Sequence, residues 1–400
     1  MLGLFPSREA MEADEAKETV SMKIAMLISG GVDSSVSLRL LRDAGHDVTA
    51  FYLKIWLEDE LAFLGECPWE DDLGYVRAVC EAAVVPLRVV SFQKEYWNEV
   101  VSYMIAEARV GRTPNPDVLC NSRIKFGMFY DRFGHEFDKV ATGHYAQMHE
   151  LPLVCHSGPD PESPGSRVKP GMTETAGKYL LKKSPDPVKD QTYFLSQLTQ
   201  AQVSKALFPI GGFRKSEVRA LAEKYRLPNA ARKDSQGICF LGAVAFDKFL
   251  EHSLGTKEGD IVDLLTGKVL GKHRGFWFHT IGQRRGLGLS GGPWYVAAKD
   301  TENNAVFVSN EWRSEEMARD SFVVSGPNWI SGHAPEKENL SVKLRHGPKE
   351  YPCAVNLLDD GKLEVKLDGF DRGIAAGQFA VFYDGDTCLG GGTIEEETSR

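Results

Sequence analysis

The stretch ISGGVDSSV, residues Ile28–Val36, decides the fold of the amino-terminal half. An apolar run, Ile24–Ile28, precedes it, and the following SSVSLRLLRDAG has apolar residues at helical spacing. A glycine turn between a buried strand and a helix lets backbone N–H groups approach an anion, and the amino end of the helix adds its dipole. The stretch therefore predicts a phosphate-binding loop, although it contains no lysine.

Strand-like and helical segments alternate after this loop. Apolar runs at 47–56, 86–92 and 137–146 are typical of strands, and the patterns at 73–85 and 97–111 are typical of helices. Such alternation predicts a doubly wound parallel sheet covered on both faces. The loop then lies at the carboxyl edge of the sheet, where proteins of this architecture bind ligands.

The pattern changes further along the chain. Residues 151–177 hold five prolines and four glycines, which predicts a surface insertion. Short β runs follow from about residue 271, with turns rich in Gly, Asp and Asn. We therefore expect an α/β fold with a small central, mainly helical region and a C-terminal antiparallel β-barrel. The expected divisions are a polar tail at 1–22, a catalytic domain at 23–205, a central region at 206–273 and the barrel at 274–400.

Composition excludes several classes of protein. No apolar run approaches the roughly 20 residues that span a bilayer, so the sequence predicts a soluble protein with no membrane partner. The seven cysteines include no C-x-x-C pair, which argues against a disulfide framework and against a common zinc site. The net charge of −9 argues against indiscriminate nucleic-acid binding but allows a local basic patch.

Two cysteines stand apart from the rest. Cys120 lies in GRTPNPDVLCNSRIKFG and Cys239 in KDSQGICFLG, both rich in Gly, Pro and Asx residues and both expected to be loops. Lysines and arginines flank each cysteine, and a nearby cation favours the reactive thiolate. The remaining five are expected to be structural, namely Cys67, Cys80, Cys155, Cys353 and Cys388.

The loop resembles the pyrophosphate-binding PP-loop of the N-type ATP pyrophosphatases, whose motif is S-G-G-x-D-S. Those enzymes cleave ATP between its α and β phosphates and attach AMP to a carbonyl oxygen. Gly30 and Gly31 would let the backbone approach phosphate oxygens, and Ser29 and Ser34 would add hydroxyl donors. Asp33 would repel phosphate, so we expect it to hold Mg²⁺.

With both cysteine motifs added, the chain resembles the tRNA-specific 2-thiouridylases, sulfurtransferases that thiolate the wobble uridine of tRNA. The resemblance runs from Lys23 to about Glu395 and includes ATGHYA at 141–146, KDQTYFL at 189–195 and HTIGQRRGLG at 279–288. It implies that ATP adenylates the uridine 2-oxygen and that sulfur from a cysteine persulfide then replaces this oxygen, with release of AMP and pyrophosphate.

Roles carry over position by position. Cys239 matches the persulfide cysteine, Cys120 the partner that frees the sulfur and ends in a disulfide with Cys239, and Asp117 a general acid/base beside the base. The implied ATP-site positions are Leu27, Ile28, Ser29, Gly30, Gly31, Val32, Asp33, Ser34, Leu53 and Gly143. The implied tRNA contacts are Asn115, Pro116, Asp117, His144, Lys189, Asp190, Gln191, Arg345, His346 and Gln378.

The residues leave the source of the sulfur open. One alternative to the persulfide is an iron–sulfur cluster held by Asp117, Cys120 and Cys239. We expect a cysteine desulfurase or a sulfur-relay protein as the donor.

One stretch supports RNA binding independently of the resemblance. Residues 264–299 contain six Lys/Arg and no Asp or Glu in an otherwise acidic chain, and include the aromatic residues Trp277 and Phe278. Such a stretch suits phosphate contacts. It is also compatible with a basic edge of a barrel whose aromatics lie in the core.

Two other functions fit parts of the sequence. An adenylating ligase or amidotransferase with the same loop would need neither Cys120 nor Cys239. A non-catalytic RNA-binding protein would not turn over ATP, and the intact Ser29–Ser34 motif argues against it.

Localisation signals conflict. The first 22 residues carry five acidic and two basic side chains, unlike a transit peptide. RHGP at 345–348 resembles plant and algal members of the family, which favours a plastid or a mitochondrion if the source is eukaryotic, with the cytoplasm as the alternative.

Overall fold

The computed structural model describes residues 20–55, 69–151, 178–233, 246–310 and 318–395. Three of the residues singled out above, Cys67, Cys155 and Cys239, lie outside the described residues, as does nearly all of the expected insertion at 151–177. Among the described helices, none is long and apolar enough to cross a membrane.

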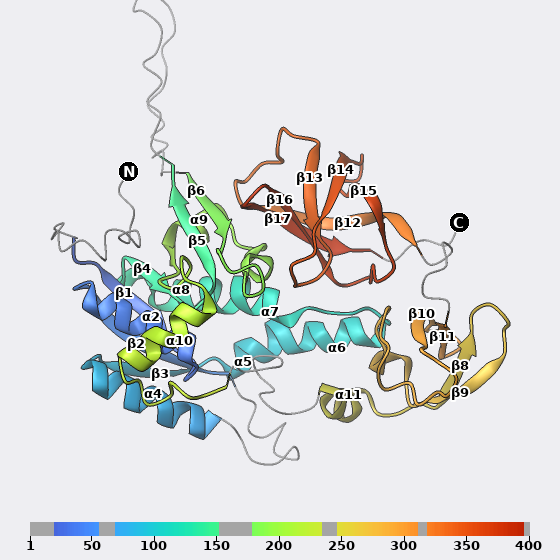
Figure 1. The fold of residues 1–400 in the computed structure, drawn as a ribbon, viewed down its shortest axis with the longest axis horizontal. Helices are drawn as coiled ribbons and strands as arrows, with labels where there is room; N and C mark the ends of the chain where they lie inside the picture. The colour runs from blue at the N-terminus through green and yellow to red at the C-terminus, as the bar shows by residue number, and fades with distance from the viewer. Residues whose placement is uncertain (1–19, 56–68, 152–177, 234–245, 311–317, 396–400) are drawn as a thin grey trace, which may run out of the picture.

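The amino-terminal half is built on a five-stranded sheet whose strands are all parallel (Figure 1). In spatial order the strands are β3 (Leu87–Ser91), β2 (Asp47–Lys54), β1 (Lys23–Leu27), β4 (Lys139–Ala141) and β7 (Ala206–Leu207). The direction of strand addition reverses between β1 and β4. Ligands bind at such a reversal in open α/β sheets, so the fold places the glycine loop after β1 at the expected position.

Both faces of this sheet are covered, as the sequence predicts. Along β1, Ile24 and Met26 join one apolar cluster and Ala25 and Leu27 join another, because successive side chains of a strand point to opposite faces. Helices α2 (Val32–Asp43) and α4 (Trp69–Ala83) cover the first face. The other face packs on helical segments from 93 to 136, which are α5 (Gln93–Tyr96), η2 (Trp97–Val101), α6 (Ser102–Arg109), α7 (Pro116–Leu119), η3 (Cys120–Met128), α8 (Phe129–Phe133) and η4 (Gly134–Glu136).

The carboxyl-terminal part forms an antiparallel barrel, also as expected. Its six strands are β12 (Arg319–Trp329), β13 (Asn339–Lys343), β14 (Tyr351–Leu357), β15 (Leu363–Asp371), β16 (Phe379–Asp384) and β17 (Thr387–Ile394). Pairing of β12 with β17 closes it. The hairpin of β5 (Ala146–Glu150) and β6 (Tyr179–Lys183) extends the same sheet, because β6 pairs with β17. The barrel is therefore joined to the amino-terminal half by backbone hydrogen bonds.

A smaller four-stranded sheet lies between these parts in the sequence, in the order β10-β11-β8-β9. Its strands are β8 (Gly259–Asp263), β9 (Val269–His273), β10 (Tyr295–Asp300) and β11 (Ala305–Ser309). The boundary expected between residues 273 and 274 thus falls inside this sheet. The run FWFHTI at 276–281 is one of the short β runs that the sequence predicts from about residue 271. It begins instead with the 3-10 turn η6 (Phe276–Phe278), because Gly275 at φ 145° redirects the chain.

Short helices complete the fold and connect the sheets. They are η5 (Thr192–Leu195), α9 (Gln200–Lys205), α10 (Lys215–Lys224) and α11 (Phe246–Leu254). Figure 1 shows α6 reaching from the large parallel sheet toward α11 and the four-stranded sheet. Ala108, Leu250 and Phe278 form a small apolar cluster at that junction, so Phe278 is a core residue there.

A buried ion pair fixes the barrel on the amino-terminal half. Lys343 of β13 lies 2.9 Å from an Asp190 carboxylate oxygen, and the two residues are 2% and 3% exposed. The Thr192 hydroxyl and the Ser184 backbone N–H also donate to this carboxylate. Every charge in the pair thus has partners, as burial requires.

Replacing Lys343 should destabilise the fold, because the buried Asp190 then lacks its ionic partner. We expect Lys343→Met to lower the free energy of unfolding by about 3–5 kcal/mol, because it leaves the buried Asp190 without its counter-ion. Urea titration followed by tryptophan fluorescence measures the change. Lys337→Met is the matched control, since Lys337 pairs with Asp384 on the exposed barrel surface and should shift stability by less than about 1 kcal/mol. Equal effects of the two substitutions would contradict the assigned role.

Candidate active site

The glycine loop is held in shape by its own serines. Ser34 Oγ accepts the Ser29 N–H at 3.2 Å and donates to the Gly31 carbonyl at 3.1 Å, and Ser35 Oγ donates to the same carbonyl at 2.9 Å. Gly31 caps α2 without a side-chain hydrogen bond, so no side chain of the cap occupies the N–H groups of the first turn. This arrangement leaves the amino end of α2 suited to an anion.

Gly30 is required by conformation and by space. Its φ is +77°, in the region that glycine adopts readily, and an added Cβ would lie 2.7 Å from the Asp72 carbonyl oxygen. A side chain at this position would therefore displace either the loop or the start of α4.

A segment some 200 residues later clamps the loop from outside. The Asn229 side-chain amide donates to the Gly30 carbonyl at 2.8 Å and to Ser35 Oγ at 2.9 Å. Arg232 also donates to the Gly30 carbonyl, at 3.1 Å, and forms an ion pair with Asp72. The loop conformation thus depends on residues that its local sequence does not contain.

A lysine that is distant in the sequence also contacts the loop. Lys215, at the start of α10, places its ammonium group 2.8 and 2.9 Å from the two carboxylate oxygens of Asp33. The Tyr145 hydroxyl donates to Asp33 at 2.9 Å. A cation therefore sits beside a phosphate-type loop that lacks a lysine of its own.

The expected Mg²⁺ site can be compared with these contacts. Among the described residues there is no cluster of three His, Cys, Asp or Glu side chains that could hold a metal. Mg²⁺ is often bound by one carboxylate together with substrate phosphates, so Asp33 fits as a single ligand for Mg²⁺ that arrives with a nucleotide. Its two oxygens are now bonded to Lys215 and Tyr145, and these bonds would have to rearrange.

Gly143 lies against this loop. A Cβ on Gly143 would be 2.7 Å from the Ser34 backbone nitrogen, so the turn after β4 touches the first turn of α2. Leu53, on β2 beside β1, is partly buried against the apolar core. These two expected ATP-site positions thus belong to the strands that flank the loop.

His144 links the loop to the segment of Cys120. Its Nδ1 is 2.7 Å from the Thr142 hydroxyl, and its ring lies edge-on to Phe208. Burial, with a smaller effect of the Lys125 charge, holds the pKa of His144 well below its ordinary value. The ring is therefore neutral at pH 7. Phe208 also packs edge-on to Phe126 of η3, so it contacts both this turn and the helical segment that begins at Cys120.

Cys120 differs from the sequence expectation. It begins η3 and is 1% exposed within the main apolar cluster, so it is helical and buried rather than in a loop. The cations expected to flank its thiol bond elsewhere: Arg112 pairs with Glu107, and Arg123 pairs with Glu99. Apolar residues at helical spacing around the cysteine outweigh the Gly/Pro/Asx signal, which belongs to the connection before it.

Asp117 lies one helical turn before Cys120. Asn115 caps the short helix α7, Pro116 occupies its first turn, and Asp117 carries a negative charge at the positive end of that helix. Residues three apart on a helix share a face. Asp117 and Cys120 therefore project from the same side of one continuous helical segment.

Several expected tRNA contacts come together around Tyr193 and Phe194. His346 stacks on Phe194 at 4.6 Å between ring centroids, and its Nε2 is 3.1 Å from the Asp190 carbonyl. Tyr193 donates to Gln378 at 3.5 Å and also bonds to Asn115. Burial lowers the pKa of His346, and the carboxylates of Asp190 and Asp117 act against that shift.

Other expected contacts are held less directly. Gln191 accepts the Tyr145 N–H at 2.9 Å, which ties it to the tyrosine that bonds Asp33. Lys189 is fixed through its backbone N–H, which donates to Asp186 at 3.1 Å. Arg345 forms an ion pair with Asp371 on the barrel.

Three of the cysteines expected to be structural are buried. Burial raises the thiol pKa to about 11 for Cys80 and to about 12 for both Cys353 and Cys388. These thiols are therefore protonated, and unreactive in this respect, at neutral pH.

Sequence reasoning missed four residues of the loop environment: Tyr145, Lys215, Asn229 and Arg232. Tyr145 lies inside the ATGHYA motif, and Arg232 directly precedes the second cysteine motif, so both were near a recognised signal. Lys215 opens a helical pattern, but nothing local directs it toward Asp33.

Comparisons with known proteins cover nearly the whole chain. Family models match in order as the tRNA methyl transferase HUP domain at 22–243, the tRNA methyl transferase PRC-barrel domain at 247–310 and the aminomethyltransferase beta-barrel domain at 319–394. Among solved structures, an NMN synthetase from Francisella tularensis has a TM-score of 0.31 at 12% identity, over 57% of this chain and 71% of that one. That likeness is too low to bear on the fold.

Curated relatives are much more similar. The tRNA-specific 2-thiouridylase MnmA of Parabacteroides distasonis is 45% identical over 94% of this chain and 100% of its own length. The protein of the same name from Porphyromonas gingivalis is 43% identical over 93% and 99%, and MnmA 2 of Bacteroides fragilis is 42% identical over 93% and 100%. On this similarity along nearly its whole length, the chain belongs to the tRNA-specific 2-thiouridylase family.

Proposed function

We propose that this chain is an ATP-dependent sulfurtransferase that replaces the 2-oxygen of the wobble uridine in tRNA with sulfur. The observation that carries the proposal is that two unlike groups flank the turn after β4. Gly143 of this turn lies against the phosphate-type loop, and the adjacent His144 packs on Phe208, which also packs on Phe126 of η3, the helical segment that begins at Cys120. Adenylation and sulfur transfer need these two groups close together.

In the first step the loop holds ATP with Mg²⁺. The uridine 2-oxygen attacks the α phosphorus, and pyrophosphate leaves. The amino end of α2 and the Lys215 ammonium group would stabilise the negative charge on the phosphates. Asp33 would hold Mg²⁺, which would supply further positive charge there. The uridine oxygen thereby becomes part of AMP, which is a good leaving group.

In the second step sulfur replaces this oxygen. The terminal sulfur of a Cys239 persulfide attacks carbon 2 of the ring, and AMP leaves with the oxygen. The Cys120 thiolate then attacks the Cys239 sulfur, which breaks the S–S bond, leaves sulfur on the uridine and forms a Cys120–Cys239 disulfide. A thiol reductant must then regenerate both thiols. Asp117 serves as the general acid/base on the ring side.

The same proposal assigns the tRNA contacts. His346 bonds to the Asp190 carbonyl and packs on Tyr193, and Tyr193 bonds to Gln378, where the barrel meets the catalytic half. This grouping suits a surface that holds the anticodon region. Residues 23–205 would act as the catalytic domain. The region from residue 206 through the four-stranded sheet, which ends at Ser309, would add tRNA contacts and Cys239, and the barrel from Arg319 onward would complete the surface.

Three further assignments belong to the proposal. Sulfur reaches Cys239 from a cysteine desulfurase or a relay protein. A cluster on Asp117, Cys120 and Cys239 is the alternative sulfur carrier, and protein free of iron that still thiolates tRNA would exclude it. An organellar address, if the source is eukaryotic, rests on the resemblance of RHGP at 345–348 and RGFWFHTIGQR at 274–284 to plant and algal members, and the relatives named above are bacterial.

Nucleoside mass spectrometry tests the reaction. Purified protein is mixed with unmodified tRNA, ATP, Mg²⁺ and a persulfide source. We expect 2-thiouridine from the wild type and at least a 100-fold loss for Cys239→Ala and for Cys120→Ala, because each removes a sulfur that the proposed steps require. Cys80→Ala is the matched control, since Cys80 is as buried as Cys120 but belongs to a separate core cluster.

Each alternative has its own outcome in this experiment. Full thiolation by Cys239→Ala would refute the persulfide assignment. Release of AMP that depends on a small acceptor and not on tRNA would indicate a ligase. Absence of any ATP turnover by the wild type would indicate a binding protein.

Lys215 should contribute to ATP binding. We expect Lys215→Ala to raise the dissociation constant of Mg–ATP by about 10–100-fold, because a charge-assisted hydrogen bond contributes about 1.5–3 kcal/mol. Isothermal titration calorimetry measures the constant. Lys224→Ala at the exposed end of the same helix is the control and should change it less than twofold. Equal constants for the two variants would remove Lys215 from the ATP site.

Gly143 provides a steric test of the same site. Gly143→Ala places a methyl group 2.7 Å from the Ser34 nitrogen, so the first turn of α2 must shift, and we expect ATP binding to weaken about tenfold or more. At Gly212 an added Cβ meets nothing within 4 Å, and Gly212→Ala should bind like the wild type. Unchanged binding by Gly143→Ala would show that nucleotide does not depend on this turn.

A further inference from the structure

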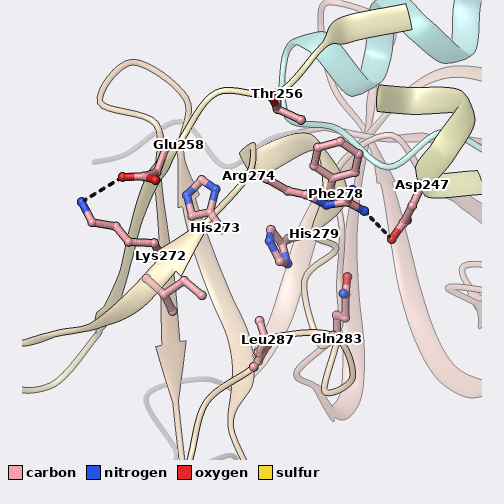
Figure 2. Close-up of a pocket in the computed structure, with 13 residues that line it drawn as sticks. Asp247, Thr256, Glu258, Lys272, His273, Arg274, Phe278, His279, Gln283 and Leu287 are labelled. Atoms are coloured by element: carbon pink, nitrogen blue, oxygen red, sulfur yellow. Dashed lines mark hydrogen bonds and ion pairs between the residues drawn. The ribbon is translucent and has the colours of Figure 1, made fainter. Parts of the chain in front are cut away.

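A cavity of about 580 Å³ lies in the central region. Figure 2 shows its lining, which comes from α11, the strands β8 and β9, η6 and the loop around Leu287. None of the candidate catalytic, ATP-binding or tRNA-binding residues lines it. Its size falls within the roughly 300–1,000 Å³ of small-molecule sites, so it could enclose a group the size of a nucleotide.

The charges around the cavity are already neutralised. Lys272 lies 2.6 Å from Asp260 and 3.9 Å from Glu258, and Arg274 pairs with Glu251 at 2.8 Å and Asp247 at 3.4 Å. Each cation thus faces two carboxylates. A free anion would find no unpaired cation among these residues, so the cavity does not suit a phosphate.

Two buried histidines stand between these pairs (Figure 2). His273 Nδ1 accepts the Gly275 N–H at 2.9 Å, which assigns its proton to Nε2. His279 is 6% exposed, and its buried Nδ1 has no hydrogen-bond partner in the described part of the chain. Burial lowers the pKa of His279 to about 4, so at pH 7 the ring is neutral.

A neutral imidazole whose buried Nδ1 has no partner among the described residues, in the wall of a cavity, indicates a polar ligand. Burying a polar group without a hydrogen bond is unfavourable, and His279 can offer one donor and one acceptor. The remaining walls include the apolar side chains of Ile261, Phe278 and Leu287. Apolar walls with a donor and an acceptor match an uncharged heteroaromatic ring such as a nucleobase.

Two exposed arginines follow a lining residue of the cavity in the chain. Arg284 and Arg285 are exposed, and neither has an acidic partner among the described residues. They sit between Gln283 and Gly286, which both line the cavity. Gln283 is itself fixed, since it accepts the Thr280 N–H and donates to the Arg285 carbonyl, each at 2.9 Å. Phosphates that flank a base in the cavity would meet these arginines.

We propose that this cavity receives an unstacked nucleobase of the tRNA, distinct from the target uridine. His279 hydrogen-bonds the edge of the base, and Arg284 and Arg285 contact the adjacent phosphates. Proteins recognise RNA sequence mainly through such splayed bases of loops and bulges. This inference rests on the proposed function, because it takes tRNA as the substrate, and it adds a second point of recognition.

Binding of unmodified tRNA to the full chain tests the proposal. We expect His279→Ala to weaken binding about tenfold with no change in the slope of log K against log salt, because no phosphate contact is lost. Replacing Arg284 and Arg285 by Ala should instead make the slope shallower by about one to two units. Lys268→Ala is the control for His279→Ala in chemical probing of the tRNA. It removes an exposed cation of the same basic stretch that does not line the cavity.

Chemical probing of the tRNA bases separates recognition from a structural effect. One base should be protected at its pairing edge by the wild type and by Lys268→Ala, and become reactive with His279→Ala. His279→Gln retains a hydrogen-bond donor and an acceptor, so it should restore part of the protection. The same variant replaces His279→Ala in the test if the alanine variant does not fold. Wild-type affinity and footprint in both His279 variants would overturn the inference alone. Failure of the wild type to bind tRNA would overturn the proposed function and this inference with it.

Discussion

The ion pair between Lys343 and Asp190 governs how the parts of this protein meet. Buried charges are tolerated only with well-placed partners, so the strand that carries Lys343 and the turn that carries Asp190 are fixed relative to each other. His346 follows Lys343 by three residues, and Gln191 follows Asp190 directly. The position of both candidate tRNA contacts therefore depends on one electrostatic requirement.

From this pair a series of hydrogen bonds leads to the glycine loop. Gln191, next to Asp190, accepts the Tyr145 N–H, the Tyr145 hydroxyl donates to Asp33, and Asp33 pairs with Lys215. The barrel, the turn after β4 and the loop are thus joined by short polar contacts as well as by apolar packing. Under the proposed function this places the surface for tRNA and the site for ATP on one rigid framework.

The sequence predicts the parts of this arrangement that are local. The apolar run before Ser29 and the helical spacing after it are enough to indicate a strand, a phosphate loop and a helix, and β1 divides its side chains between two cores as a buried parallel strand should. The barrel is likewise evident from alternating residues and turn signals. Neighbouring residues determine both the strand–loop–helix unit and the barrel strands, so the local sequence is enough to predict them.

Features set by distant contacts were not predictable in this way. Cys120 was expected in a loop because Gly, Pro and Asx residues precede it, yet tertiary packing of Val118, Leu119 and Ile124 makes the segment helical and buried. The run FWFHTI has the composition of a strand, but Gly275 turns the chain and Phe276 and Phe278 are both buried. In each case packing outweighs the local signal.

The lysine beside the glycine loop is also positioned by tertiary contacts and not by local sequence. Lys215 and Arg232 lie about 200 residues after the loop, and only the fold brings them to Asp33 and Gly30. The nucleotide cradle is therefore complete only when the segment from 215 to 232 is packed against α2. Arg232 precedes Cys239 by seven residues, so the clamp that shapes the loop also fixes where the chain leaves toward this cysteine. Under the proposed function, one segment thereby links the geometry of ATP binding to the supply of sulfur.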